Sequence, residues 1–129
     1  MLRVFTLAAA LSAGPALSAE IETPTGQAVV LYDVILEKEM GIARFLFLAP
    51  GIAIEQDNGI TYTDMSEVFP WLCETVILPA LAQNTWEAAE VVISMADREV
   101  EFGTRDPEAV QFFEVFSVDA EDGCIWEGF

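Results

Sequence analysis

Carboxylates are the only potentially reactive side chains that this sequence supplies in number. The 129-residue chain holds 22 acidic residues, 5 basic residues and no histidine. A Ser-His-Asp triad is therefore excluded, and the eight glycines form none of the phosphate-binding glycine motifs. Two facing carboxylates could hydrolyse a glycosidic bond, but nothing in the sequence singles out a pair. We keep a carboxylate-based hydrolase as a remote alternative, and we expect a protein that is not an enzyme and uses no cofactor.

The stretch Asp-Ala-Glu-Asp-Gly at residues 119–123 places several oxygen donors before a glycine. Asp119, Glu121 and Asp122 resemble the start of a calcium-binding loop. The later ligand positions of such a loop are missing, and an Asp-Gly hairpin turn explains the same residues. We favour the turn, and keep a cation- or small-ligand-binding module at residues 119–123 as the alternative function.

The two cysteines, Cys73 and Cys124, are an even pair in a small chain. In an oxidising compartment such a pair is most simply one disulfide. A redox pair would need a Cys-x-x-Cys motif, and a zinc site would be expected to use histidine; the sequence has neither. The disulfide would close a loop of about 50 residues, which loop-closure entropy values at roughly 4 kcal/mol.

A few basic and aromatic residues are candidates for contacts with a partner. Arg44, Arg98 and Arg105 lie among many acids, so salt bridges are their default interpretation, with an anionic ligand as the alternative. Phe112 and Phe113 are adjacent on an expected strand and point to opposite sides, which leaves one ring free to lie at the surface. We take Arg98, Phe112 and Phe113 as candidate partner or ligand contacts.

The net charge of −17 restricts the partners of this chain. Such a chain is repelled by nucleic acid and by anionic lipid. Hydrophobic residues make up 53% of the sequence, which is too many for a disordered acidic chain. The composition predicts one folded domain over residues 20–129, whose oligomeric state is left open.

The first 19 residues have the pattern of a secretory signal peptide. A basic start at Arg3 precedes an apolar run at residues 4–13, a Gly-Pro break and a set of small residues. Cleavage is expected after Ser18 or Ala19. The run is shorter than the roughly 20 residues that span a bilayer, so we expect no membrane span in the mature chain, which would be periplasmic or secreted.

The elements that must position these residues are mostly strands. Alternating or continuous apolar runs bounded by turn residues predict strands. They fall at residues 27–37, 42–49, 60–63, 89–96, 99–103, 111–118 and 124–129. Residues 20–26 are expected to form an extended lead-in, and a helix over residues 106–116 is the alternative for the strand at 111–118.

One helix is predicted between these strands. Asp64 and Glu67 have the spacing of a capping box, and an apolar stripe with helical periodicity follows from Phe69 to Leu81. Pro70 suggests a late start or a kink, and Pro79 suggests an end near residues 78–82. Cys73 lies within the stripe, so its sulfur should face the core.

These elements predict an α+β fold. We expect an antiparallel sheet of about five strands with one main helix packed on one face. The Cys73–Cys124 disulfide would tie that helix to the last strand.

Several blocks in the second half of the sequence carry a resemblance. They are Leu-Cys-Glu-Thr at 72–75, Ile-Ser-Met-Ala-Asp-Arg-Glu-Val-Glu-Phe-Gly at 93–103, Gln-Phe-Phe-Glu at 111–114 and Cys-Ile-Trp-Glu-Gly-Phe at 124–129. In this order they resemble an uncharacterised family of small exported alphaproteobacterial proteins, a domain of unknown function. The resemblance implies a periplasmic setting and a disulfide, and it implies no activity. From the sequence we therefore expect a non-enzymatic periplasmic interaction or accessory protein with a protein partner.

Overall fold

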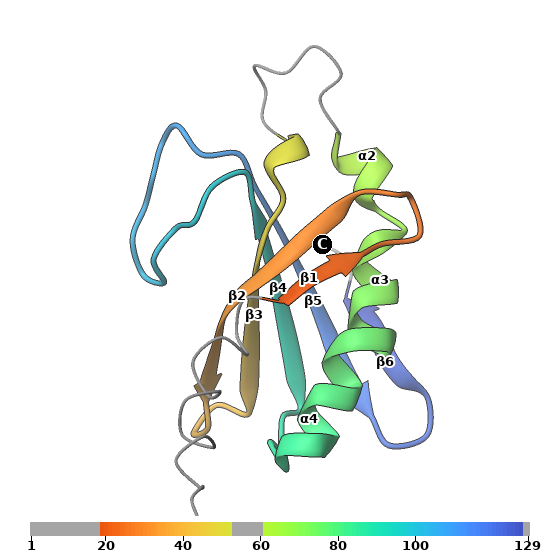
Figure 1. Cartoon of the computed structure of the whole chain (residues 1–129). Helices are drawn as coiled ribbons and strands as arrows, with labels where there is room; N and C mark the ends of the chain where they lie inside the picture. Colours follow the sequence, from red (N-terminus) through yellow and green to blue (C-terminus); the bar gives the residue numbers. More distant parts are fainter. Residues whose placement is uncertain (1–18, 53–60, 128–129) are drawn as a thin grey trace, which may run out of the picture.

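The computed structural model describes residues 19–52 and 61–127, and these contain one six-stranded sheet with the strands in chain order (Figure 1). The strands are β1 (Ala19–Glu22), β2 (Ala28–Glu37), β3 (Ile42–Leu48), β4 (Glu90–Ala96), β5 (Gln111–Asp119) and β6 (Gly123–Glu127). Residues 20–26, which were expected to form an extended lead-in, are therefore partly a strand. Residues 20–22 belong to β1 and pair antiparallel with β2, and a turn from Thr23 to Gly26 follows.

The sheet is mixed and not antiparallel as expected, and it has six strands where about five were expected. β3 and β4 run parallel, whereas every other neighbouring pair is antiparallel. The physical reason is the long connection between them, which carries the helix and returns the chain to the end of the sheet where β3 began. A hairpin could not have made this crossover.

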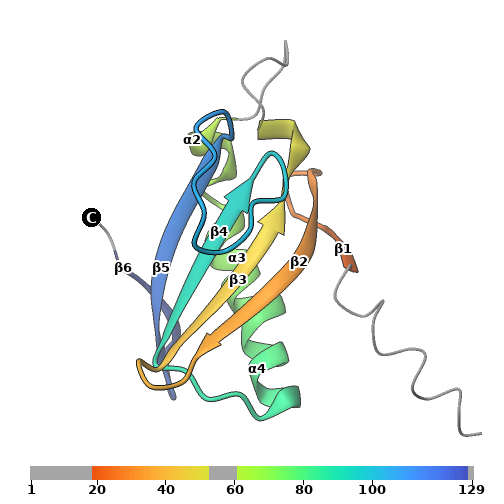
Figure 2. The same cartoon turned by 90° about the vertical axis from the view of Figure 1, so that its left-hand side faces the viewer.

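The helix lies on one face of the sheet and covers its centre (Figures 1 and 2). Its segments are α2 (Tyr62–Met65), α3 (Val68–Leu72), the π-helical turn η4 (Cys73–Ile77) and α4 (Leu78–Asn84). The expected strand at residues 60–63 is wrong for the part that is described, because Thr61 is the N-cap of α2 and residues 62–63 are helical.

The capping box is real but lies one turn earlier than expected. The Thr61 hydroxyl accepts a hydrogen bond from the Asp64 amide, and the Asp64 carboxylate accepts one from the Thr61 amide. Asp64 is thus the third helical residue and not the cap, and Glu67 makes no capping bond. These carboxylate hydrogen bonds hold the pKa of Asp64 below its usual value.

The two prolines shape the helix without ending it. Pro70 lies in the first turn of α3, where the missing N–H has no intrahelical partner. Pro79 follows the π turn, in which the Leu78 amide bonds the Cys73 carbonyl, and this wider turn leaves room for the proline ring. The helix therefore runs beyond the expected end at residues 78–82 and stops at Thr85, which has a left-handed backbone.

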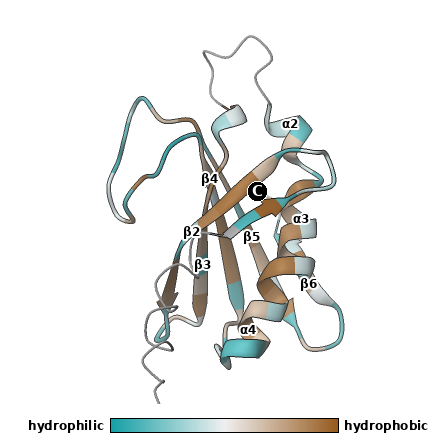
Figure 3. Ribbon diagram, viewed as in Figure 1, coloured by the Kyte–Doolittle hydropathy of each residue, from teal (hydrophilic) through white to brown (hydrophobic). Residues whose placement is uncertain are grey.

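The helical run from Tyr62 to Asn84 is long and apolar enough to cross a membrane by length and composition alone. Core helices pass the same test, and this one buries its apolar stripe against the sheet. Phe69, Leu72 and Ile77 are fully buried with Phe45 and Ile93 of the sheet. In Figure 3 the brown, apolar stretches of the ribbon lie along the strands and the helix that pack together.

A β-bulge in β2 changes which of its side chains face the helix. The pairing with β3 shifts between Leu31 and Asp33, so Tyr32 has no partner in the register. Val29 and Leu31 pack toward the core before the bulge, and Val34 and Leu36 do so after it. This explains why both alternating sets of β2 look apolar in the sequence.

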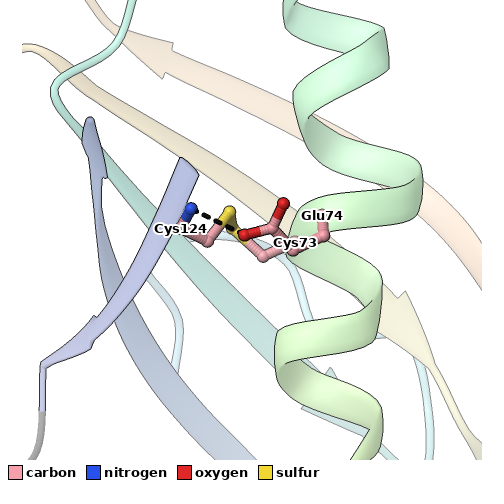
Figure 4. Close-up of a disulfide and its surroundings, with 3 residues drawn as sticks. All are labelled: Cys73, Glu74 and Cys124. Atoms are coloured by element: carbon pink, nitrogen blue, oxygen red, sulfur yellow. Dashed lines mark hydrogen bonds between the residues drawn. A yellow bond between two sulfur atoms is a disulfide. The ribbon is translucent and has the colours of Figure 1, made fainter. Parts of the chain in front are cut away.

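The predicted disulfide is confirmed. Cys73 and Cys124 are bonded, and Cys73 is fully buried on the inner face of the helix (Figure 4). The carboxylate of Glu74 accepts a hydrogen bond of 2.8 Å from the Cys124 amide. Gly123 has a φ of +76°, a left-handed backbone that favours glycine, and a Cβ there would lie 2.7 Å from the Glu74 carboxylate and displace it.

The connection between β4 and β5 differs from both predictions. Residues 99–103 form no strand, and the alternative helix over residues 106–116 is also absent, because β5 begins at Gln111. The chain from Asp97 to Val110 instead forms an irregular loop on the face of the sheet opposite the helix (Figure 2). We call it the outer loop.

Candidate functional site

The strand register gathers a set of side chains on the outer face of the sheet, away from the helix. Leu46, Ser94 and Phe113 are paired neighbours across β3, β4 and β5. Two residues earlier along both strands, and on the same face of the sheet, Arg44 of β3 is paired with Val92 of β4. Because side chains alternate along a strand, these residues all point away from the helix that covers Phe45 and Ile93.

The outer loop is closed at its base by Asp97 and Val110. The Asp97 amide bonds the Val110 carbonyl at 3.0 Å, and the Asp97 carboxylate accepts a bond of 3.1 Å from the Val110 amide. A compact loop with paired ends is often functional. Arg98 also bonds the Asp97 carboxylate, and this contact holds the pKa of Asp97 below its usual value.

Tyr32 attaches the middle of the outer loop to the sheet. Its hydroxyl donates to the Val100 carbonyl and accepts from the Val100 amide, each at 3.0 Å. Tyr32 is the residue that the β-bulge leaves without a strand partner. The bulge therefore has a structural consequence beyond β2, because it provides the side chain that holds Val100 and Phe102 over the sheet.

The outer loop and the sheet enclose a cavity of about 220 Å³, which we call the outer pocket. Leu46, Val92 and Ser94 come from its central strands, Gln111 and Phe113 come from β5, and residues 100–104 of the loop line the opposite side. Phe102 and Phe113 both line the pocket while remaining 44% and 55% exposed. The pocket thus has apolar walls and an aromatic opening.

Arg44 lies at one side of the outer pocket. Its Nε bonds the Glu37 carboxylate at 2.8 Å, and its guanidinium lies 5.3 Å from the centre of the Phe102 ring. Both contacts favour a charged guanidinium, and the second holds Phe102 in place. Because Glu37 balances the charge of Arg44 and Glu101 also lines the pocket, the site as a whole is not cationic.

Ser94 is the one buried polar side chain here without a partner. It is 8% exposed, and its hydroxyl makes no hydrogen bond with any residue in the part of the chain that the structure describes. Thr23 and Glu114, the other buried polar residues, both have partners. A buried hydroxyl without a hydrogen bond is costly, so a group bound in the outer pocket would gain by pairing with it.

A second polar cluster lies on the inner face, where every group is paired. The buried carboxylate of Glu114 accepts hydrogen bonds from the Tyr62 hydroxyl and, at 2.6 Å, from Trp126 Nε1. The bond to the carboxylate raises the pKa of Tyr62. This cluster joins α2 and β6 to β5, and we interpret it as structural.

The candidate contacts from the sequence do not gather at one place. Phe113 lines the outer pocket, whereas Phe112 packs inward against Tyr62 and Phe69. The expectation of one ring on each side is therefore correct. Arg98 lies at the base of the outer loop, paired with Asp97 and 4.0 Å from Glu108, and outside the pocket lining.

The acidic stretch at residues 119–123 forms the β5–β6 hairpin turn. One carboxylate oxygen of Asp119 accepts hydrogen bonds from the amides of Glu121 and Asp122 at 2.9 and 2.8 Å. These bonds lower the pKa of Asp119. Within residues 19–52 and 61–127 no group of three or more His, Cys, Asp and Glu side chains is placed to hold a metal ion.

The sequence did not identify Ser94, Gln111 and Phe102 as members of one site, and for Arg44 it predicted a salt bridge, with an anionic ligand as the alternative. A partial signal was present. Arg44 interrupts the apolar strand between Ala43 and Phe45, and Ser94 is a polar residue within the apolar run of β4. Which of these polar residues would meet depended on the parallel register of β3 and β4, and that was not predicted.

The comparison with family profiles gives a match over residues 5–129 to a family of unknown function, DUF6497. The chain belongs to this family. This match confirms the resemblance of the sequence blocks to an uncharacterised family, a domain of unknown function. Comparison with curated proteins and with solved structures gave no match.

Proposed function

We propose that this DUF6497 protein is exported and binds a partner protein through the outer pocket, without catalysing a reaction itself. The observation that carries the proposal is the Ser94 hydroxyl, which has no partner among residues 19–52 and 61–127 and lines a cavity with two exposed aromatic rings. Exposed aromatic residues around a small pocket are typical of protein interfaces, where a few anchors supply most of the binding energy.

The architecture supports a binding role for the outer face. The outer loop is held by Tyr32, Asp97 and the Arg44–Phe102 contact, so the pocket exists before a partner arrives. A preformed pocket lowers the ordering cost of association. The carboxylates of Glu114 on the inner face and of Asp119 in the β5–β6 turn already accept hydrogen bonds, and they contribute less to a site.

Export rests on the pattern of residues 1–19, of which residues 1–18 lie outside the described part of the structure. The Cys73–Cys124 disulfide favours an oxidising compartment. The mass of the intact protein from a periplasmic extract tests this. We expect a chain that has lost residues 1–18 or 1–19 and the two thiol hydrogens, whereas a full-length chain with free thiols would contradict export.

Binding is tested by co-purification of the tagged protein from the periplasm, with and without a change in the pocket. Phe113→Ala removes an exposed ring of the outer pocket, and Met40→Ala removes an exposed side chain (67%) at the β2–β3 turn as a matched control. We expect a protein that the wild type and Met40→Ala recover equally and that Phe113→Ala loses. Equal recovery by all three would contradict a role for the pocket.

A further inference from the structure

The outer pocket is the feature that supports the most specific inference. Its volume of about 220 Å³ is smaller than the roughly 300–1,000 Å³ of sites for drug-sized ligands. A cavity of this size accommodates one large side chain. Tryptophan, tyrosine and arginine are enriched among the residues that fill pockets near the centre of protein interfaces and supply most of the binding energy.

The lining of the pocket favours an aromatic ring with a polar end. Phe102, Phe113, Leu46 and Val92 provide an apolar surface, and aromatic rings gain extra energy from contact with one another. An aliphatic or phenylalanine anchor would seal the Ser94 hydroxyl without a partner. A phenol reaches beyond the ring and can both donate to and accept from a serine hydroxyl.

The charges around the pocket oppose an anionic occupant. Arg44 is the positively charged residue of the pocket lining, but it already pairs with Glu37, and Glu101 adds a further carboxylate to the lining. The whole chain carries a net charge of −17. Basic residues beside the anchor would be attracted to this surface, and acidic residues would be repelled.

We infer that the outer pocket receives a tyrosine side chain from a basic segment of the partner protein, with the tyrosine hydroxyl hydrogen-bonded to Ser94. The ring lies against Phe102 and Phe113, and the neighbouring lysine or arginine residues face Glu37 and Glu101. This inference rests on the proposed function and specifies the chemistry of its partner.

In the test, each of two proteins is titrated with each of two peptides, and binding is measured by NMR from the amide resonances of the protein. The peptides are acetyl-Arg-Tyr-Arg-amide and acetyl-Arg-Phe-Arg-amide, and the proteins are the wild type and Ser94→Ala. Because the Ser94 hydroxyl has no hydrogen-bond partner within the described part of the chain, Ser94→Ala should fold normally. The amide spectrum of each protein verifies this before titration.

We expect millimolar binding, with shifts confined to residues around the outer pocket. The wild type should bind the tyrosine peptide about fivefold more tightly than the phenylalanine peptide, which is the effect of one net hydrogen bond. Ser94→Ala should bind the two peptides equally, because the partner of the phenol is gone. A third peptide, acetyl-Glu-Tyr-Glu-amide, should bind the wild type more weakly than its arginine counterpart.

Several results would overturn the inference. They are equal binding of both arginine peptides by the wild type, a preference for tyrosine that persists in Ser94→Ala, binding of the glutamate peptide as tight as that of its arginine counterpart, or shifts elsewhere on the protein. If these occur while Phe113→Ala still loses its partner in co-purification, the proposed function stands and only the tyrosine anchor is wrong. If co-purification shows no role for Phe113, the proposed function itself fails.

Discussion

The two faces of the sheet are built from the same strands but have opposite properties. On the inner face Phe45, Ile93 and Phe116 are fully buried beneath the helix, and the polar group there, Glu114, is hydrogen-bonded. On the outer face the loop covers the sheet only in part, and it leaves Phe113 exposed and Ser94 unpartnered. The contrast indicates that the inner face stabilises the fold, whereas the outer face is available for binding.

Two phenylalanines on one strand give the largest contrast. Phe116 of β5 is fully buried on the inner face, and Phe113 of the same strand is 55% exposed on the outer face. We expect Phe116→Ala to lower the free energy of unfolding by about 3–5 kcal/mol, because it leaves a cavity. Phe113→Ala should cost less than about 1 kcal/mol. Urea unfolding of both variants tests this, and equal losses would contradict the assignment of the two faces.

Removal of the disulfide should have the next largest effect. The Cys73–Cys124 bond spans 51 residues and joins the helix to β6. The double variant Cys73→Ala, Cys124→Ala should lose roughly 2–4 kcal/mol of unfolding free energy. The outer pocket contains no residue of η4 or β6, so the amide resonances of its lining should move little. Large shifts around Ser94 would show that the two faces are not independent.

The closure of the outer loop should depend on pH through Asp97. Hydrogen bonds from Arg98 and Val110 lower the folded-state pKa of Asp97 below its usual, unfolded-state value. Its stabilising effect is therefore present above that value and is lost as the pH falls through the folded-state pKa. Thermal unfolding measured between about pH 5 and pH 2 should show a steeper loss for the wild type than for Asp97→Asn. Parallel curves would mean that Asp97 contributes nothing to stability.

The contribution of Tyr62, on the inner side, to the free energy of unfolding should depend on pH at the alkaline end of the range. Its bond to Glu114 raises the folded-state pKa of the phenol above 10.0. The stabilisation is thus complete below the unfolded-state pKa and is lost as the pH rises through the folded-state value. Tyr62→Phe should be less stable than the wild type at neutral pH, with a difference that narrows in alkali. A constant difference would contradict this assignment.

The smallest expected effect is that of Ser94→Ala. The hydroxyl of Thr23, another buried polar residue, donates to the Gln27 carbonyl at 2.6 Å, so Thr23→Ala should cost about 1 kcal/mol. Ser94 has no such partner in the described part of the chain, and Ser94→Ala should leave the unfolding free energy unchanged or slightly higher. A loss as large as that of Thr23→Ala would contradict the description of the pocket floor.

Local patterns in the sequence predicted the helix, the hairpin turn at residues 119–123 and the disulfide. Each depends on residues whose effect is local, such as the apolar stripe that carries Cys73 and the Asp-Gly turn before Cys124. The parallel pairing of β3 and β4 was missed, although a strand, a helix and a strand in succession are typical of a crossover. Residues 99–103 alternate like a strand, but Val100 is held by Tyr32 from β2, and no local pattern reveals that contact.

The outer pocket could not be predicted from the sequence for a related reason. Its members come from β3, β4, β5 and the outer loop, and only the register places Leu46, Ser94 and Phe113 in one row. Phe113 was identified because an aromatic pair on a strand must split between two faces. Ser94 is visible in the sequence as a polar residue within an apolar strand, but such a serine more often has a hydrogen-bond partner, so it was not identified as a site residue.

The central claim is that the outer face is where this protein meets its partner. A photo-crosslinking amino acid placed at Phe113 in the producing cell tests it most directly, with a second protein carrying the same group at Met40 for comparison. The account predicts a discrete protein adduct from position 113 that is absent from position 40. An adduct from position 40 alone, or none from position 113, would contradict it.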